Sequence, residues 1–140
     1  MGGGGRPFRL LKRERRLWQA YHSSPATLMA FWNFERRFGE AGVNAVLRHG
    51  LSEHEGQTAY EVIRKVGHNA ATAIDEHGAD ALRAITRHPK HAERIALHIA
   101  RHGPLAMKTI NRAEATGMDI GLALKELSRQ VYRQPHLKPR

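Results

Sequence analysis

The sequence predicts an all-α fold, a compact bundle of about six to eight helices of unequal length that opens with an aromatic helical hairpin. Apolar residues recur at spacings of 3 and 4 through most of the chain, which is the period of amphipathic helices. No alternating apolar and polar run bounded by hairpin turns indicates a strand. Four similar signals divide the chain into short helices: His49-Gly50, His77-Gly78, His88-Pro89 and His102-Gly103. Histidine suits the negative end of a helix, glycine accepts the left-handed cap conformation, and proline cannot continue the helix.

The N-terminal part is predicted to form the hairpin after a flexible, glycine-rich start at 1–7. Leucine and aromatic residues at helical spacings predict an amphipathic helix over about 8–22, with an arginine-rich outer face. A second helix is expected over 26–38. Seven of the nine aromatic residues lie between Phe8 and Phe38. We expect them to form the core of the hairpin, and the alternative is a surface for a partner or for stacked bases.

The rest of the chain is interpreted as further helices of one domain, 8–133, followed by a basic tail at 134–140. The expected helices are about 42–48, 57–76, 79–87, 90–101, 104–116 and 118–133. The helix over 57–76 has Gly67 inside it, at a cost of about 1 kcal/mol relative to alanine, and this glycine indicates a close contact between helices.

Length, charge and composition limit the classes of protein. The chain has 140 residues, about one domain, and a formal net charge of +10 from 23 lysines and arginines against 13 carboxylates. No apolar run approaches the roughly 18 residues of a membrane span, and no secretory signal pattern opens the chain. The absence of cysteine excludes disulfide scaffolds, zinc fingers, iron–sulfur sites and thiol nucleophiles. These observations predict a soluble, cytoplasmic, basic domain with an anionic partner.

The basic residues form the strongest functional signal, and they gather toward the two ends of the sequence. The segment 53–80, by contrast, is locally acidic. Arginine binds phosphate and carboxylate bidentately, which favours contact with one anionic partner over a merely solvated helix face. The candidate residues for binding a partner or nucleic acid are Arg13, Arg15, Arg16, Trp18, Trp32, Arg36, Arg37, Arg129, Arg133, Lys138 and Arg140.

Catalytic and metal motifs are absent from the sequence, so we expect no enzyme, no cofactor and no metal site. There is no nucleophile elbow, Walker A loop or dinucleotide fingerprint. On one continuous helix, His88, His91, His98 and His102 would share a face, and His98 and His102 have a spacing that can hold a metal. No HExxH motif or cysteine accompanies them. Helix capping and an amphipathic border explain these histidines better, and a pH-dependent surface charge is the alternative.

A family resemblance lies between His77 and Met107, in the run HGADALRAITRHPKHAERIALHIARHGPLAM. It contains a glycine after a helix, an I-x-x-x-P step from Ile85 to Pro89 and an E-x-I-A-x-x-I step. Residues from about 60 to 140, including the basic tail, resemble the BID domain of type IV secretion effectors and conjugative relaxases. The resemblance implies a helical bundle that acts as a translocation signal for a secretion coupling ATPase, without catalysis of its own.

The sequence therefore predicts a non-catalytic, basic, helical interaction domain that engages an acidic protein surface. The resemblance implies that this surface belongs to a secretion coupling ATPase and that the protein leaves the cytoplasm through a specialised secretion system. One alternative is a DNA- or RNA-binding accessory protein of a mobile element, with Trp18 or Trp32 as a stacking platform. Another is a small phage-type inhibitor that binds a host protein through the aromatic hairpin. The oligomeric state stays open, and 8–38 is a candidate dimer interface.

Overall fold

The all-α prediction is confirmed by a computed structural model, which describes residues 27–50 and 53–133. Within these residues there is no strand. The α-helices are α2 (Thr27–His49), α3 (Ala59–Val66), α4 (His68–Arg87), α5 (Ala92–His102), α6 (Pro104–Thr116) and α7 (Ile120–Arg133), with a 3-10 turn, η1 (Pro89–His91), before α5. The predicted helix over 8–22 and the basic tail at 134–140 lie outside the described residues.

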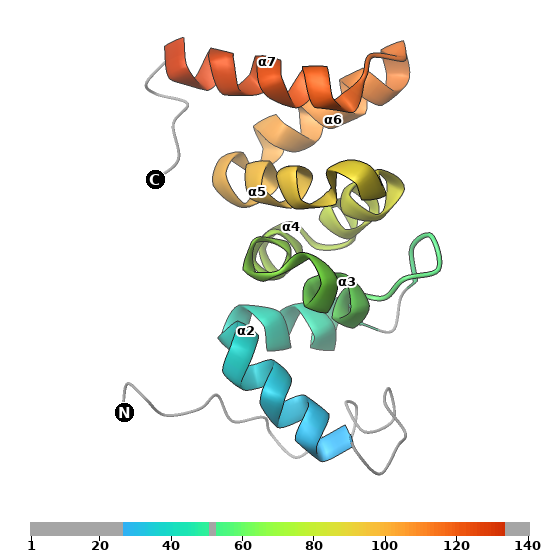
Figure 1. Cartoon of the computed structure of the whole chain (residues 1–140), viewed down its shortest axis with the longest axis vertical. Helices are drawn as coiled ribbons and strands as arrows, with labels where there is room; N and C mark the ends of the chain where they lie inside the picture. Colours follow the sequence, from blue (N-terminus) through green and yellow to red (C-terminus); the bar gives the residue numbers. More distant parts are fainter. Residues whose placement is uncertain (1–26, 51–52, 134–140) are drawn as a thin grey trace.

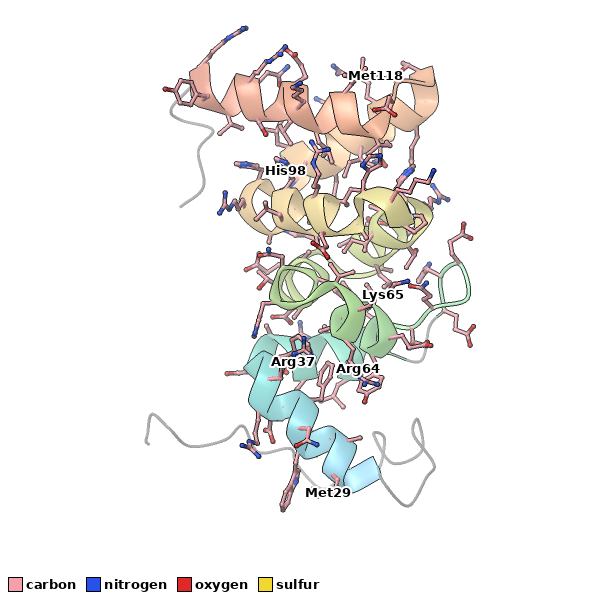
Figure 2. The ribbon with its side chains drawn as sticks, in the orientation of Figure 1. Met29, Arg37, Arg64, Lys65, His98 and Met118 are labelled. Carbon is pink, nitrogen blue, oxygen red and sulfur yellow. The ribbon has the colours of Figure 1, made fainter. Side chains whose placement is uncertain are left out.

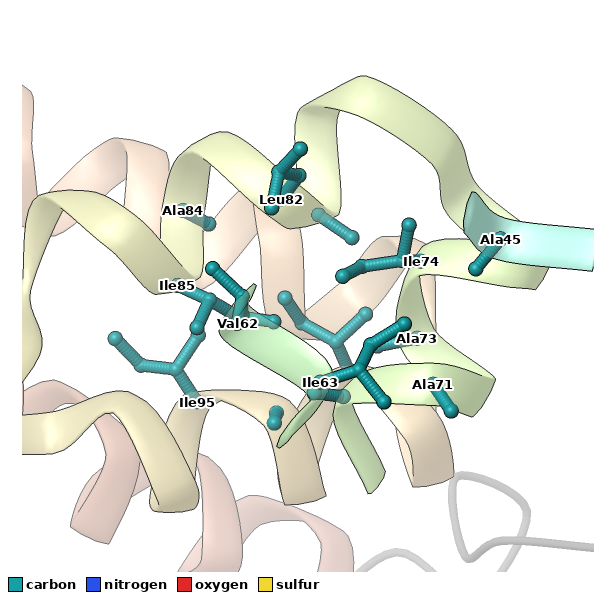
Figure 3. Close-up of a cluster of buried hydrophobic side chains, with 14 of the residues drawn as sticks. Ala45, Val62, Ile63, Ala71, Ala73, Ile74, Leu82, Ala84, Ile85 and Ile95 are labelled. Atoms are coloured by element: carbon teal, nitrogen blue, oxygen red, sulfur yellow. The ribbon is translucent and has the colours of Figure 1, made fainter. Parts of the chain in front are cut away.

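The helices follow one another along the long axis of the molecule, from α2 at one end to α7 at the other (Figure 1). Helices that follow one another in the chain pack together, and α2 in addition packs extensively on α4, which also contacts α3 and α5. The core is mostly aliphatic, and it also contains buried aromatic rings of α2 and α3: Phe31, Phe34, Phe38 and Tyr60. Figure 3 shows part of the aliphatic cluster, including Ile63, Ile74, Ile85 and Ile95. None of the described helices has both the length and the apolar character that a membrane crossing requires.

Glycines set the limits of the helices, and one of these limits differs from the prediction. The expected helix over 57–76 was wrong, because Gly67 separates α3 from α4 at φ 112 and ψ −162. Only glycine adopts such angles without strain, so this position ends a helix and does not lie within one. Residues 26–38 and 42–48 were predicted as two helices. They form the two arms of α2, which is kinked at Gly39.

A short sequence pattern recurs at three helix ends and at a kink of α4, where Gly78 has φ 68 and ψ −144, and its apolar positions are buried each time. Three residues before His49, His77, His88 and His102 stand Val46, Ile74, Ile85 and Ile99, which are at most 4% exposed. Six residues before the same histidines stand Val43, Ala71, Leu82 and Ala96, which are at most 1% exposed. These two positions lie on one face of each helix. Every such helical segment therefore presents the same narrow apolar face to the core, with its histidine at the end.

Two of these histidines pack against the glycine of a later helix end. A Cβ atom at Gly103 would lie 3.1 Å from both Cε1 and Nε2 of His77, and one at Gly78 would lie 3.3 Å from His49 Cε1. Gly103 also has φ 53 and ψ −122, which side chains rarely adopt. The glycine thus serves two purposes, since it turns the chain and leaves room for an imidazole from the preceding part of the stack.

Side-chain caps and one carboxylate fix the remaining helix ends. Thr58 and Glu61 form a capping box at α3, with the Thr58 N–H donating to Glu61 Oε1 at 3.0 Å. Asp119 Oδ2 accepts from the N–H of Leu122 at 3.0 Å and so caps α7. At the end of α4, the His88 side chain forms a hydrogen bond with Glu114 of α6, and its Nε2 lies 2.6 Å from Glu114 Oε2. Each contact satisfies polar groups where a helix begins or ends.

We expect Gly103→Ala to lower the free energy of unfolding by about 2 kcal/mol, because it strains the backbone and crowds His77. Chemical denaturation measures this change. In a His77→Ala background the cost should fall by about 0.5–1 kcal/mol, since the crowding is then removed. Gly117→Ala, where φ is 75 and no atom lies within 4 Å of the added Cβ, is the control for strain alone. If Gly103→Ala costs the same free energy of unfolding in both backgrounds, the added methyl group does not crowd His77.

Candidate anion-binding groove between α2 and α3

Most of the net charge lies outside the described part of the chain. The described residues hold 15 lysines and arginines against 12 carboxylates, a net +3, whereas the remaining 35 residues account for +7. Several of the described arginines are also paired, for example Arg48 with Asp75 at 3.1 Å and Arg87 with Glu114 at 3.6 Å. A binding site within the described residues must therefore be sought among cations that no carboxylate neutralises.

The structure does not bring the sequence-predicted site residues together. Trp32, Arg36 and Arg37 lie on α2, and all three are exposed. Arg129 and Arg133 are exposed on α7, at the opposite end of the stack (Figure 1). The other candidates lie outside the described residues: Arg13, Arg15, Arg16, Trp18, Lys138 and Arg140. The two ends of the molecule must consequently be considered as separate surfaces.

A groove between α2 and the start of α3 joins one predicted residue to others that the sequence did not single out. It has a volume of about 290 Å³. Figure 2 shows Arg37 and Arg64 beside this junction, with Lys65 on the neighbouring position of α3. The lining residues are Ala30, Asn33, Phe34, Arg37, Phe38, Tyr60 and Arg64. Two helices thus contribute one guanidinium each to the same groove.

The walls of the groove are aromatic and closely packed. The ring centroids of Phe34 and Phe38 are 4.9 Å apart, and those of Phe34 and Tyr60 are 5.0 Å apart. These three rings are at most 9% exposed, so they form a firm floor. Phe31, Phe34 and Phe38 are buried, whereas Trp32 is 53% exposed. The predicted packing of these rings against the helix over 8–22 lies outside the described residues.

Both arginines rest on this aromatic floor. The Arg37 guanidinium carbon lies 4.8 Å from the centroid of Phe38, and that of Arg64 lies 5.4 Å from the centroid of Tyr60. Neither forms an ion pair with a carboxylate of the described residues. A guanidinium over a ring is attracted by the ring face and still presents N–H donors at its edge. The groove therefore holds two oriented cations with donors available for an anion.

Sequence reasoning found Arg37 but missed Arg64, Tyr60 and Asn33. Arg64 follows Tyr60 by four residues on a helix, a spacing that places both on one face. That local signal was present in the sequence. What the sequence did not show was that α3 packs beside α2, which depends on the helix break at Gly67.

Glu35 of α2 is the unusual acid near this groove. It is 7% exposed, and its Oε2 has no hydrogen-bond partner in the described residues. Burial raises the pKa of the Glu35 carboxyl, because desolvation disfavours its charged form. Ionised Glu35 is therefore a cost to the folded state at neutral pH.

The four histidines do not form the common face that the sequence suggested. His88 caps α4 and His91 ends the 3-10 turn, so only His98 and His102 share the α5 helix. Their rings stack with centroids 5.8 Å apart. Burial, His102 and the nearby Arg94 and Arg101 together lower the pKa of His98. The described residues contain no group of three or more potential metal ligands.

Comparisons with protein-family models, with curated proteins and with solved structures found no match to this chain. The function must therefore be argued from the residues and their arrangement.

We expect Glu35→Gln to raise the free energy of unfolding at pH 7 by about 1 kcal/mol, because it removes a desolvated charge whose Oε2 has no hydrogen-bond partner in the described residues. The folded-state pKa is raised, so the penalty is present above that pKa. It disappears as the pH falls below the unfolded value of about 4.3, where both states are protonated. Denaturation at several pH values tests this. Glu40→Gln, at an exposed position of the same helix, is the matched control. A gain that persists at pH 3 would rule out the ionisation of Glu35 as its cause.

Proposed function

We propose that the protein is a non-catalytic helical interaction domain that binds an acidic surface of a protein partner through the groove between α2 and α3. The observation that carries this proposal is the pair of guanidiniums, Arg37 and Arg64, held over buried rings without a carboxylate partner in the described residues. Lys65 and Arg36, both exposed, add positive charge beside them.

The chemistry of the groove suits a carboxylate side chain in a protein interface. Arginine and tyrosine are the residues that most often dominate the binding energy of such interfaces. Carboxylate oxygens match the N–H fork of a guanidinium and form short, charge-assisted hydrogen bonds with it. The lining residues contain no carboxylate or histidine that could act as a general base, which supports binding over catalysis.

Nucleic-acid binding is the second candidate, because Trp32 is exposed on the same helix as Arg36 and Arg37. An exposed indole can stack on an unpaired base, and the arginines could contact the adjoining phosphates. In this mode the affinity would fall steeply as salt is added. A plot of log K against log salt concentration would have a slope of about −0.7 for each phosphate of a single strand that the protein neutralises.

The resemblance to the BID domain supports a more specific form of the proposal, in which the domain directs transport through a type IV secretion channel. The acidic partner would then be the coupling ATPase. Arg129 and Arg133 are exposed near the C-terminal end of α7, so they could act together with Lys138 and Arg140 of the tail. Arginines so close to one another in the chain would raise the rate of encounter with an acidic surface.

We expect Arg37→Glu/Arg64→Glu to weaken binding of a labelled acidic peptide, Glu-Glu-Phe repeated four times, by about tenfold or more. Calorimetric titration at 0.15 M NaCl measures it. Arg37→Lys/Arg64→Lys keeps the positive charges but removes the paired N–H donors of the guanidiniums, so we expect an intermediate loss of affinity. Unchanged affinity in the charge-reversed variant would overturn the groove as the site. Tighter binding of a 20-nucleotide single strand than of the peptide, lost in the same variant, would favour the nucleic-acid candidate instead.

Deletion of 134–140 should lower translocation of a reporter fusion through a type IV channel by about tenfold, if the basic tail is part of the signal. Replacement of the tail by seven glycines and serines should cause the same loss, and Arg140→Lys should retain export. Full export without the basic tail would contradict the transport role. It would not bear on the α2–α3 groove, which the peptide titration tests separately.

A further inference from the structure

A second groove lies at the other end of the stack, between α6 and α7. Its volume is about 430 Å³. Its floor is apolar and includes Leu105 and Ala113 of α6, and Ala123 and Leu127 of α7. Met118, in the turn between the two helices, closes one end and is 53% exposed (Figure 2). The groove is therefore an apolar surface with an exposed thioether at its edge.

The position of this groove in the stack explains why it is open. The earlier helices are covered by the helix that follows them, as α4 is by α5 and α5 by α6. After α7 the described residues provide no further helix. Stacked helical proteins usually end in a capping element with a polar outer face. Here the last pair instead exposes Met118, Leu122 and Tyr132, which are 53–80% exposed.

The rim of the groove is positively charged. Lys108 and Arg112 stand one turn apart on α6, both are exposed, and neither forms an ion pair with a carboxylate of the described residues. Glu126 is the acid among the lining residues, and Arg129 Nη1 lies 3.5 Å from its Oε2. Glu126 belongs to α7, and the acid of α6, Glu114, is engaged by Arg87 and His88 at the end of α4. On α6, Lys108 and Arg112 thus line the groove while Glu114 does not, although Lys108 also borders the hollow between α4 and α6 that Glu114 lines.

We propose that the groove between α6 and α7 binds an amphipathic α-helix of a partner protein, whose apolar stripe enters the groove while flanking acidic residues meet Lys108 and Arg112. A helix laid there would continue the stack in the way that each described helix continues the previous one. Leucine-type side chains at i, i+3, i+4 and i+7 are the usual anchors of a helix in an apolar groove.

Charge complementarity favours this occupant over segments of the chain itself. The tail at 134–140 carries Lys138 and Arg140 and no carboxylate. The predicted amphipathic helix over 8–22, from the same or a second copy, has an arginine-rich polar face. Either segment would place like charges beside Lys108 and Arg112, which costs binding free energy. An acidic helix removes that repulsion and gains attraction at the same positions.

The test uses the full chain and two labelled 15-residue peptides with the same leucine stripe, one flanked by glutamates and the other by lysines. Fluorescence anisotropy at 0.15 M NaCl should show the glutamate peptide binding about tenfold more tightly. Lys108→Glu/Arg112→Glu should reverse this preference. The matched control, Lys90→Glu/Arg101→Glu, makes the same change of charge at exposed positions away from the groove and should leave the preference unaltered.

Thr116→Trp gives an independent measurement, since Thr116 is an exposed lining residue and an indole there would fill the groove. This substitution should weaken the binding of both peptides. The far-UV circular dichroism spectrum should stay unchanged, which shows that the variant is folded. Equal binding of the two peptides, or a preference that the charge reversal leaves intact, would overturn the proposal. So would tighter peptide binding after deletion of 134–140, or a dimer in sedimentation that Thr116→Trp dissociates, because these results identify the tail or a second copy as the occupant. Arg37→Glu/Arg64→Glu should not affect this assay, which keeps it distinct from the α2–α3 groove.

Discussion

The backbone conformation of a few glycines is the constraint on which the rest of the structure depends. Gly39, Gly67, Gly78, Gly103 and Gly117 all have φ between 53 and 112. Each ends or kinks a helix, so the chain forms short segments that are marginal in isolation and need neighbours to bury their apolar faces. The repeated pattern of buried residues before each terminal histidine gives those segments the same face, and Gly78 and Gly103 leave space for the histidines of preceding segments.

In this stack the interior faces of the helices form the core, and the two ends carry the grooves that we propose to serve in recognition. In the middle of the stack, cations are paired across helices, as Arg48 is with Asp75 and Arg87 is with Glu114. At the ends, Arg37 and Arg64 stand over aromatic rings, and Lys108 and Arg112 border an apolar groove. The net charge of +10 describes these surfaces poorly, because the described residues contribute only +3 of it.

The sequence specified the helix ends well where proline or glycine followed a histidine. The prediction of 104–116 agrees with α6, and the stop at His88-Pro89 agrees with the end of α4. Gly67 was misjudged because the apolar spacing continues unchanged across it, and only the backbone angles distinguish a break from a close contact. The shared histidine face, which required one continuous helix from His88, does not form, because a 3-10 turn precedes α5. Arg64 could not be assigned, because its meaning depends on a contact between helices about 25 residues apart in the chain.

The difference between a stacked and a free arginine decides which of the basic residues can supply affinity. A free side chain such as Arg133 must lose rotamer freedom on binding, at a cost of about 0.5–1.5 kcal/mol for each immobilised chain. Arg37 and Arg64 are already held over Phe38 and Tyr60, so less of that freedom remains to be lost. The rings themselves are buried, so the surfaces on which the two guanidiniums rest are fixed by the core. Exposed arginines at the far end act mainly through long-range attraction, which salt screens beyond about 8 Å. A partner would therefore be drawn in by many arginines but retained by the few that rest on aromatic rings.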